Sequence, residues 1–330
     1  MADLSTSYLG LALKNPVIVG ASPLTATVDA LRRCEDAGAG AVVMKSLFEE
    51  QIRAETTGLR QELENELHWH AEVFAYMEAD LGMRYGPREY LQIVSEAKKH
   101  LSIPIIASIN CTTPENWADF AAEVEGSGAD ALELNIAIMP TAFDRTAEEV
   151  ESEFVRIVET ARETVGLPIS VKLPQHFSAL PHLVLRLARA GANGLVLFNR
   201  LYQPTIDPET VTVTIGERRS ASAEISTALR WTALLADRVN LDIATNTGVH
   251  TGADVARCIL AGADAVQIVS AVLASGHQVI GEMTQYLDEW MERMNYETIS
   301  DARGLLSQAQ KPDEDLFGRC QYIKGIVGAD

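Results

Sequence analysis

The feature that most constrains this chain is a unit that recurs along its 330 residues: a short apolar run ending on a polar residue, then a segment with helical spacing. Residues 167–200 show the unit in full. The run 169–171 stops at Lys172, apolar residues then recur at helical spacing as far as Gly191, and a second run ends at Asn199. Strand, helix and strand within about thirty residues predict a βαβ unit with parallel strands. Gly191 stands where that helix needs a left-handed residue to stop.

Eight such runs occur, with a helical segment in each gap. Eight βα units predict an α/β fold of the closed (β/α)8 or TIM-barrel type rather than an open doubly wound sheet. The nucleotide motifs of open sheets, GxGxxG after the first strand and GxxxxGK(S/T), do not occur in the sequence. We expect one barrel domain over residues 1–304 and a C-terminal tail over 305–330. The runs lie at residues 17–21, 41–44, 105–109, 131–134, 169–171, 194–198, 243–245 and 265–269.

Two gaps are too long for a simple loop and helix. They span about residues 47–102 and 200–240, and both follow the C-terminal end of a strand. We therefore expect both insertions to lie over the mouth of the barrel, where long loops usually cover a bound ligand. Packing against another subunit is the alternative.

Composition excludes several classes of protein. The net charge of −19 argues against a nucleic acid partner, because binding phosphate backbones needs a basic face. No apolar run is long enough for a membrane span, and the N-terminus lacks the features of a signal peptide, so we expect a cytoplasmic protein. The four cysteines lie far apart without a CxxC pair. That pattern favours free thiols, and we expect no metal site.

Polar residues at the ends of the predicted strands meet at one edge of a barrel. Two of them are lysines, Lys45 and Lys172, and three are asparagines, Asn110, Asn135 and Asn199. Lysines are rarely buried unless they are paired, so salt bridges to neighbouring carboxylates would be one explanation. Because an amide both donates and accepts hydrogen bonds, the whole set favours a ligand rich in carbonyls and ring nitrogens.

The last two strands end in a pattern typical of a phosphate site. Asn246, Thr247 and Gly248 precede a helix that begins near Gly252, and Ser270 precedes a helix expected to start near Leu273. In (β/α)8 enzymes these two loops commonly hold a phosphate through backbone N–H groups. Ordinary turn chemistry would select the same residue types.

Several motifs together resemble a known family. They are MKS at 44–46, VKLP at 171–174, ATNTGV at 244–249, TGADVARCILAGADAVQI at 251–268 and YETISDARG at 296–304. In order and spacing they look like class 1 dihydroorotate dehydrogenases, the FMN enzymes that convert dihydroorotate to orotate in pyrimidine biosynthesis. The resemblance implies an FMN-dependent oxidoreductase with a small-molecule substrate. It also implies a homodimer, with a redox partner protein as a further option.

The resemblance also implies roles for individual residues. Lys45, in the MKS motif with Ser46, would contact FMN and substrate, and Lys172 would lie near flavin N1, where its charge would stabilise a reduced anionic ring. Ala21 and Ser22 would face the flavin. The three strand-end asparagines match positions that hold the flavin or the substrate ring. The phosphate loops would be formed by Asn246, Thr247, Gly248, Val269 and Ser270.

Two departures from the family pattern concern the substrate. Where the family has a Cys or Ser base after the fourth strand, this chain has Ile138, and Pro140 replaces an asparagine that grips the substrate. The asparagine-rich loop after the second strand is not recognisable either, and TTGLRQELENE is the nearest match. Isoleucine cannot take a proton, and Cys111 is the nearest thiol at a strand end. We therefore expect an altered substrate, or a flavin-binding electron-transfer subunit without its own dihydroorotate activity. A barrel lyase that forms a Schiff base on Lys45 or Lys172 is the less favoured interpretation.

Overall fold

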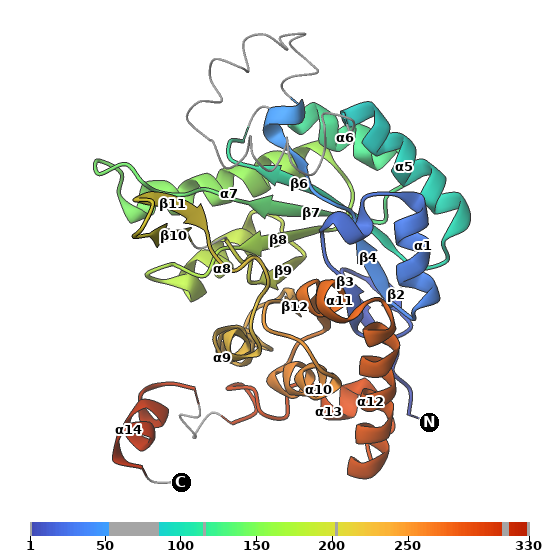
Figure 1. Cartoon of the computed structure of the whole chain (residues 1–330), viewed down its shortest axis with the longest axis vertical. Helices are drawn as coiled ribbons and strands as arrows, with labels where there is room; N and C mark the ends of the chain where they lie inside the picture. The colour runs from blue at the N-terminus through green and yellow to red at the C-terminus, as the bar shows by residue number, and fades with distance from the viewer. Residues whose placement is uncertain (1, 53–85, 115–116, 202–203, 312–316, 329–330) are drawn as a thin grey trace.

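Eight parallel strands form a closed barrel surrounded by helices (Figure 1). The computed structural model of the protein describes residues 2–52, 86–114, 117–201, 204–311 and 317–328. Each barrel strand pairs with its neighbour in chain order, and pairing of the last strand with the first closes the ring. The predicted (β/α)8 fold is thus confirmed. The strands are β3 (Val17–Val19), β4 (Ala41–Val43), β6 (Ile105–Cys111), β7 (Ala131–Ile136), β8 (Ile169–Leu173), β9 (Gly194–Leu197), β12 (Asp242–Thr245) and β13 (Ala265–Ile268).

The helices cover the outside of this barrel. In α8, the four residues Leu180, Leu183, Val184 and Leu187 are buried, which is the expected apolar stripe at helical spacing. Gly191 follows with φ of +105°, in the left-handed region where a residue without Cβ is favoured. The covering helices are α1 (Val28–Asp36), α5 (Pro87–His100), α6 (Ala118–Gly126), α7 (Ala147–Thr164), α8 (Leu180–Arg189), α9 (Ile225–Leu235), α10 (Gly252–Ala261) and α12 (Gln278–Met294).

The barrel is closed at the N-terminal ends of its strands. A hairpin of β1 (Thr6–Tyr8) and β2 (Leu11–Leu13) packs its Tyr8, Leu9 and Leu13 against apolar residues of the barrel interior. The backbone N–H of Leu9 donates to Asp242 Oδ2 at 2.6 Å, which fixes the hairpin to β12. The opposite end, where the strands finish, is the mouth.

The two predicted insertions contain different secondary structure. In the first, β5 (Leu47–Phe48) adds to the edge of β6, and α5 is an ordinary barrel helix. Residues 53–85 of that insertion, including TTGLRQELENE, lie outside the described residues. In the second, a hairpin of β10 (Pro204–Asp207) and β11 (Thr212–Ile215) is followed by the short 3-10 helix η3 (Ser222–Glu224) and by α9.

The last covering helices, α9, α10 and α12, pack side by side. After β13, α11 (Ser270–Ser275) begins at Ser270, three residues before the predicted start, because the helical turn follows directly from the strand. The short α13 (Ile299–Ala302) leads to a segment in which Leu306 N donates to Leu260 O, and α14 (Arg319–Val327) ends the described chain (Figure 1). No helix within the described ranges is both long and apolar enough to cross a lipid bilayer.

Candidate functional site at the barrel mouth

Three polar side chains form one row across adjacent strands at the mouth. Asn110 of β6 pairs in register with Asn135 of β7, and Asn135 pairs with Lys172 of β8. Side chains in a strand alternate between its two faces, so residues two apart share a face. Ile106, four residues before Asn110, belongs to the cluster that fills the barrel interior. The row therefore lies on the inward face, at the level where the strands end.

Lys172 is almost completely buried. Its side chain is 6% exposed, and its Nζ lies 3.7 Å from Oε1 of Glu133, two residues before Asn135 on β7. A separation of 3.7 Å is an ion pair rather than a hydrogen bond. The ammonium carries three N–H donors, and none of them makes a hydrogen bond to the part of the chain that the structure describes. The salt bridge considered from the sequence exists, but it leaves these donors free for an acceptor in the mouth.

Asn199 joins this row from the next strand. Its Nδ2 donates to Asn135 Oδ1 at 2.9 Å, and its backbone N–H donates to the Leu173 carbonyl at 2.7 Å. Because the Asn135 carbonyl oxygen accepts this bond, the NH2 group of Asn135 remains available as a donor. The three asparagines are all half-buried, as expected for side chains at the edge of an open mouth.

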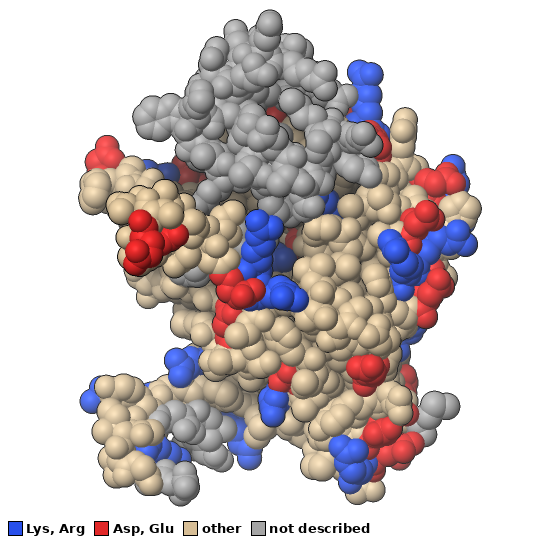
Figure 2. All heavy atoms as spheres, viewed as in Figure 1, with Lys and Arg blue, Asp and Glu red and all other residues tan. Residues whose placement is uncertain are grey.

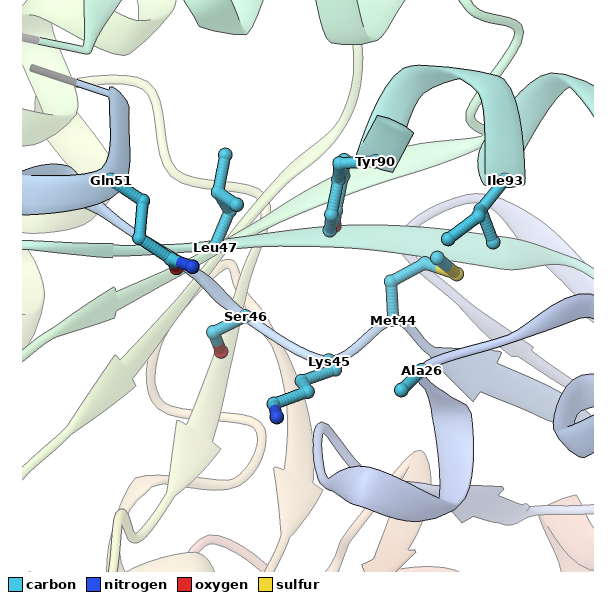
Figure 3. A pocket seen from close by; sticks show the side chains of 8 residues that line it. All are labelled: Ala26, Met44, Lys45, Ser46, Leu47, Gln51, Tyr90 and Ile93. Atoms are coloured by element: carbon cyan, nitrogen blue, oxygen red, sulfur yellow. The ribbon is translucent and has the colours of Figure 1, made fainter. Parts of the chain in front are cut away.

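Lys45 and Ser46 approach from the link between β4 and β5. Figure 3 shows both side chains on one side of the chain, opposite Met44 and Leu47, and Met44 points toward Ile93 of α5. The hydroxyl of Ser46 lies 2.8 Å from that of Ser108, an inward residue of β6. Lys45 thus lies on the same side of the chain as Ser46, whose hydroxyl meets an inward residue of β6.

Ala21 and Ser22 follow β3 after Gly20. Ser22 is buried, its hydroxyl donates to the Gly20 carbonyl at 3.2 Å, and the residue precedes the short helix η1 (Pro23–Thr25). Ala21 is half-buried beside it. The Lys45 N–H donates to the Thr25 carbonyl at 3.3 Å, so this loop and the lysine are held together.

The loop after β12 is fixed by polar contacts to the end of β9. Asn246 Nδ2 and Thr247 Oγ1 both donate to the Phe198 carbonyl, at 2.8 and 2.9 Å. Thr247 and Gly248 have φ of +76° and +81°. A Cβ on Gly248 would lie 2.2 Å from the backbone N of Ile225, the first residue of α9. The glycine is therefore required by the close approach of α9.

A residue that the sequence did not single out joins the two predicted phosphate loops. Ser220, from the second insertion, accepts from the Gly248 N–H at 3.3 Å through its hydroxyl. Its own N–H donates to Ser270 Oγ at 2.9 Å, and its hydroxyl lies 3.2 Å from His250 Nε2. Val269 and Ser270 are half-buried at the start of α11. No local pattern marks Ser220, because its contacts are 28 to 50 residues away along the chain.

The loop after β7 carries no acid or base at the position where the family has one. Ile138 is 8% exposed and belongs to the main hydrophobic core, whereas Met139 is 59% exposed and Pro140 is also exposed. The Ala137 N–H donates to the Cys111 carbonyl at 3.2 Å and ties the loop to β6. The stretch 137–143 contains no carboxylate, imidazole or thiol.

Cys111 is placed away from the mouth. It follows Asn110 on β6, so it faces the layer between barrel and helices, and it is fully buried. Burial, reinforced by the nearby Glu49 carboxylate, raises the pKa of the Cys111 thiol well above its ordinary value. Glu49 itself accepts hydrogen bonds from the backbone N–H groups of Thr112 and Thr113, at 2.8 and 3.0 Å. A protonated thiol in this position is a poor candidate for a general base.

Acidic and basic side chains are mixed on one face of the molecule. Figure 2 shows acidic and basic side chains interspersed over the face in view, without a continuous basic stripe. Within the described ranges, no group of three or more His, Cys, Asp or Glu side chains is arranged to hold a metal ion.

Fold and site together define a (β/α)8 protein with a donor-rich ligand site at its strand ends. The sequence profile of the dihydroorotate dehydrogenase family matches residues 3–291, so the chain belongs to this family of oxidoreductases.

Curated relatives agree with this assignment. The catalytic subunit of dihydroorotate dehydrogenase B (NAD(+)) from Pyrococcus abyssi is 27% identical over 307 residues, 92% of this chain and 98% of that protein. The Methanothermobacter thermautotrophicus protein of the same name is 27% identical over 316 residues, with the same coverage. The one from Methanocella arvoryzae is 32% identical over 272 residues, 80% of this chain and 85% of that protein.

Proposed function

We propose that this chain is an FMN-dependent oxidoreductase of the dihydroorotate dehydrogenase type that binds the flavin across the barrel mouth. The observation that carries the proposal is the row of Asn110, Asn135 and Lys172, in which a nearly buried ammonium keeps its N–H donors unused. A flavin ring presents carbonyl oxygens and ring nitrogens to such donors and an N–H to acceptors. The donor set present here therefore fits FMN.

The residues that would hold FMN come from most of the strand ends. Bound FMN supplies the capacity to accept two electrons from a substrate. Lys172 would place positive charge beside the flavin, and the strand-end amides would orient it. The polar hydroxyls and backbone N–H groups after β12 and β13 would take the phosphate. The proposed set is Ala21, Ser22, Lys45, Ser46, Asn110, Asn135, Lys172, Asn199, Asn246, Thr247, Gly248, Val269 and Ser270.

We propose further that dihydroorotate is not the substrate of this chain. Oxidation of dihydroorotate needs a base that removes a carbon-bound proton, and a positioned base typically contributes about 10²–10⁴-fold to such a step. The core packing of Ile138, the raised pKa of Cys111 and the exposure of Pro140 support the proposal, because together they leave the β7 loop without that base.

The lack of a base in the loop after β7 also favours a second candidate function, an FMN subunit that passes electrons to a partner protein. The curated relatives are named catalytic subunits, and a catalytic subunit implies another subunit in its complex. In this candidate the chain holds the flavin, and the reduced flavin passes its electrons on to the partner protein. Membership of an oxidoreductase family weighs against the Schiff-base lyase. Schiff-base chemistry would also leave the strand-end asparagines without a role.

Anaerobic mixing of the FMN-loaded protein with dihydroorotate tests the proposal. We expect the flavin absorbance to persist, while dithionite bleaches it, because reduction by dithionite needs no protein base. Bleaching by dihydroorotate at rates typical of enzymes, on the order of 1–10³ s⁻¹, would contradict the altered substrate. Glu49 and Cys111 would then be the residues to substitute.

A further inference from the structure

Glu133 is a charged residue in the interior of the barrel. It lies one inward position below Asn135 on β7, is 0% exposed, and pairs in register with Ser108 and Ser170 of the neighbouring strands. Below it the interior is filled by apolar side chains and by the N-terminal hairpin. A carboxylate buried in such surroundings is strongly unfavourable unless it is paired and hydrogen-bonded.

The two oxygens of Glu133 have different partners. Oε2 accepts a hydrogen bond of 2.6 Å from Gln267 Nε2, across the barrel on β13. Oε1 lies 3.7 Å from Lys172 Nζ and makes no hydrogen bond to any residue that the structure describes. The carboxylate is therefore fixed from the β13 side and joined to Lys172 by charge alone.

The partner of Glu133 Oε2, Gln267, is itself buried. Gln267 is 1% exposed, and a Cβ on Gly20 would lie only 3.2 Å from its Oε1. Gly20 thus leaves room for the Gln267 side chain, whose Oε1 makes no hydrogen bond to any residue that the structure describes. The amide keeps its donor aimed at Glu133.

This arrangement has two consequences for Lys172. A short hydrogen bond to Glu133 would turn the ammonium into the barrel, whereas an ion pair at 3.7 Å attracts it and leaves its donors for the mouth. The negative charge of Glu133 also offsets part of the positive charge that Lys172 presents to a ligand.

We infer that Glu133, fixed by Gln267, is a positioning residue that holds Lys172 at the mouth and, through its charge, sets the reduction potential of the bound flavin. The inference rests on the proposed function. A positive charge near the flavin favours the reduced, anionic form, so a negative charge behind that lysine holds the potential down. Ser108 and Ser170, which flank Glu133 in register, carry no charge and contribute no such effect.

The test is the midpoint potential of FMN in Glu133→Gln, measured by spectroelectrochemistry, together with the dissociation constant of oxidised FMN. Glutamine preserves the shape of the side chain and removes its charge. We expect a more positive potential, equivalent to a roughly tenfold gain in the affinity for reduced relative to oxidised flavin, or about 30 mV for a two-electron couple. Ser170→Ala, a neutral change at the neighbouring buried position, should leave the potential unchanged.

A second variant covers the case in which Glu133→Gln does not fold. The exchange Glu133→Gln with Gln267→Glu keeps one carboxylate and one amide across the same 2.6 Å contact and moves the charge to β13. Its potential should also rise, since the carboxylate no longer adjoins Lys172. An unchanged potential in either folded variant overturns the inference alone. A parent protein that binds no FMN overturns the proposed function and the inference with it.

Discussion

Replacing Gly248 by alanine tests how the loop after β12 is built. Gly248 has φ of +81°, and a Cβ there would lie 2.2 Å from Ile225 N and 2.7 Å from Ile225 Cα. Ordinary contact begins at 3.4 Å, and both atoms belong to backbone, so the loop and the first turn of α9 would have to separate by about 1 Å.

The magnitude is the sum of two costs. The left-handed conformation costs an alanine about 1–2 kcal/mol, and overpacking against backbone costs about 1–3 kcal/mol more. We expect the free energy of unfolding to fall by about 2–5 kcal/mol and the Tm by roughly 3–7 °C. FMN affinity should fall roughly tenfold or more, because the shifted loop carries Asn246 and Thr247.

Gly10→Ala is the matched control. Gly10 lies in the turn of the N-terminal hairpin, has φ of +72°, and has no atom within 4 Å of the position of an added Cβ. It should show only the conformational cost, about 1–2 kcal/mol, and unchanged FMN affinity. Thermal melting and fluorescence titration with FMN measure both quantities. If Gly248→Ala and Gly10→Ala have the same Tm and the same affinity for FMN, the close approach of α9 does not shape the site.

Three further predictions concern buried charge, buried thiols and the altered loop. Lys172→Met removes the cation beside the Glu133 carboxylate and should lower the free energy of unfolding by about 3–5 kcal/mol. Adding Glu133→Gln should restore most of that stability, while the FMN affinity of the double variant stays roughly 10- to 150-fold weaker than that of the parent. Recovery of FMN affinity in the double variant would mean that Lys172 only neutralises Glu133. Burial raises the pKa of Cys34 from 9.0 to about 11, so its contribution to stability is complete below pH 9 and is lost as the pH rises toward 11. Urea unfolding between pH 9 and 11 measures how the free energy of unfolding falls with pH. This slope should be about 1.4 kcal/mol per pH unit smaller in Cys34→Ala than in the parent. Equal slopes in the two proteins would contradict the burial of this thiol. Ile138→Cys should not give flavin reduction by dihydroorotate, because Pro140 still alters the loop; rapid bleaching in this variant would show that only the base is missing.

Much of the fold could be predicted from the sequence, because each barrel strand is a continuous apolar run that ends at a polar residue. Asn110, Asn135 and Lys172 could be placed at one edge, since parallel strands of a barrel finish together. Glu133 was also detectable in principle: a carboxylate inside the apolar run ALEL has no local reason to be there.

Other features depend on contacts that no local pattern encodes. The hydrogen bond between Gln267 and Glu133 joins residues 134 positions apart, and Ser220 reaches its partners only when the second insertion folds back on β12 and β13. The sequence marks Gly248 only as part of a predicted phosphate loop, whereas the structure shows that α9 approaches it closely. The early start of α11 results from the way β13 turns directly into a helix.

The most direct test of the account is whether the protein binds FMN. The purified protein, or the protein reconstituted with FMN and separated from free flavin by gel filtration, should carry about one non-covalent FMN per chain, with a visible flavin spectrum. Heat denaturation should release the flavin for identification by chromatography. A colourless protein that takes up no FMN on reconstitution, while its far-UV circular dichroism shows a folded barrel, would contradict the central claim.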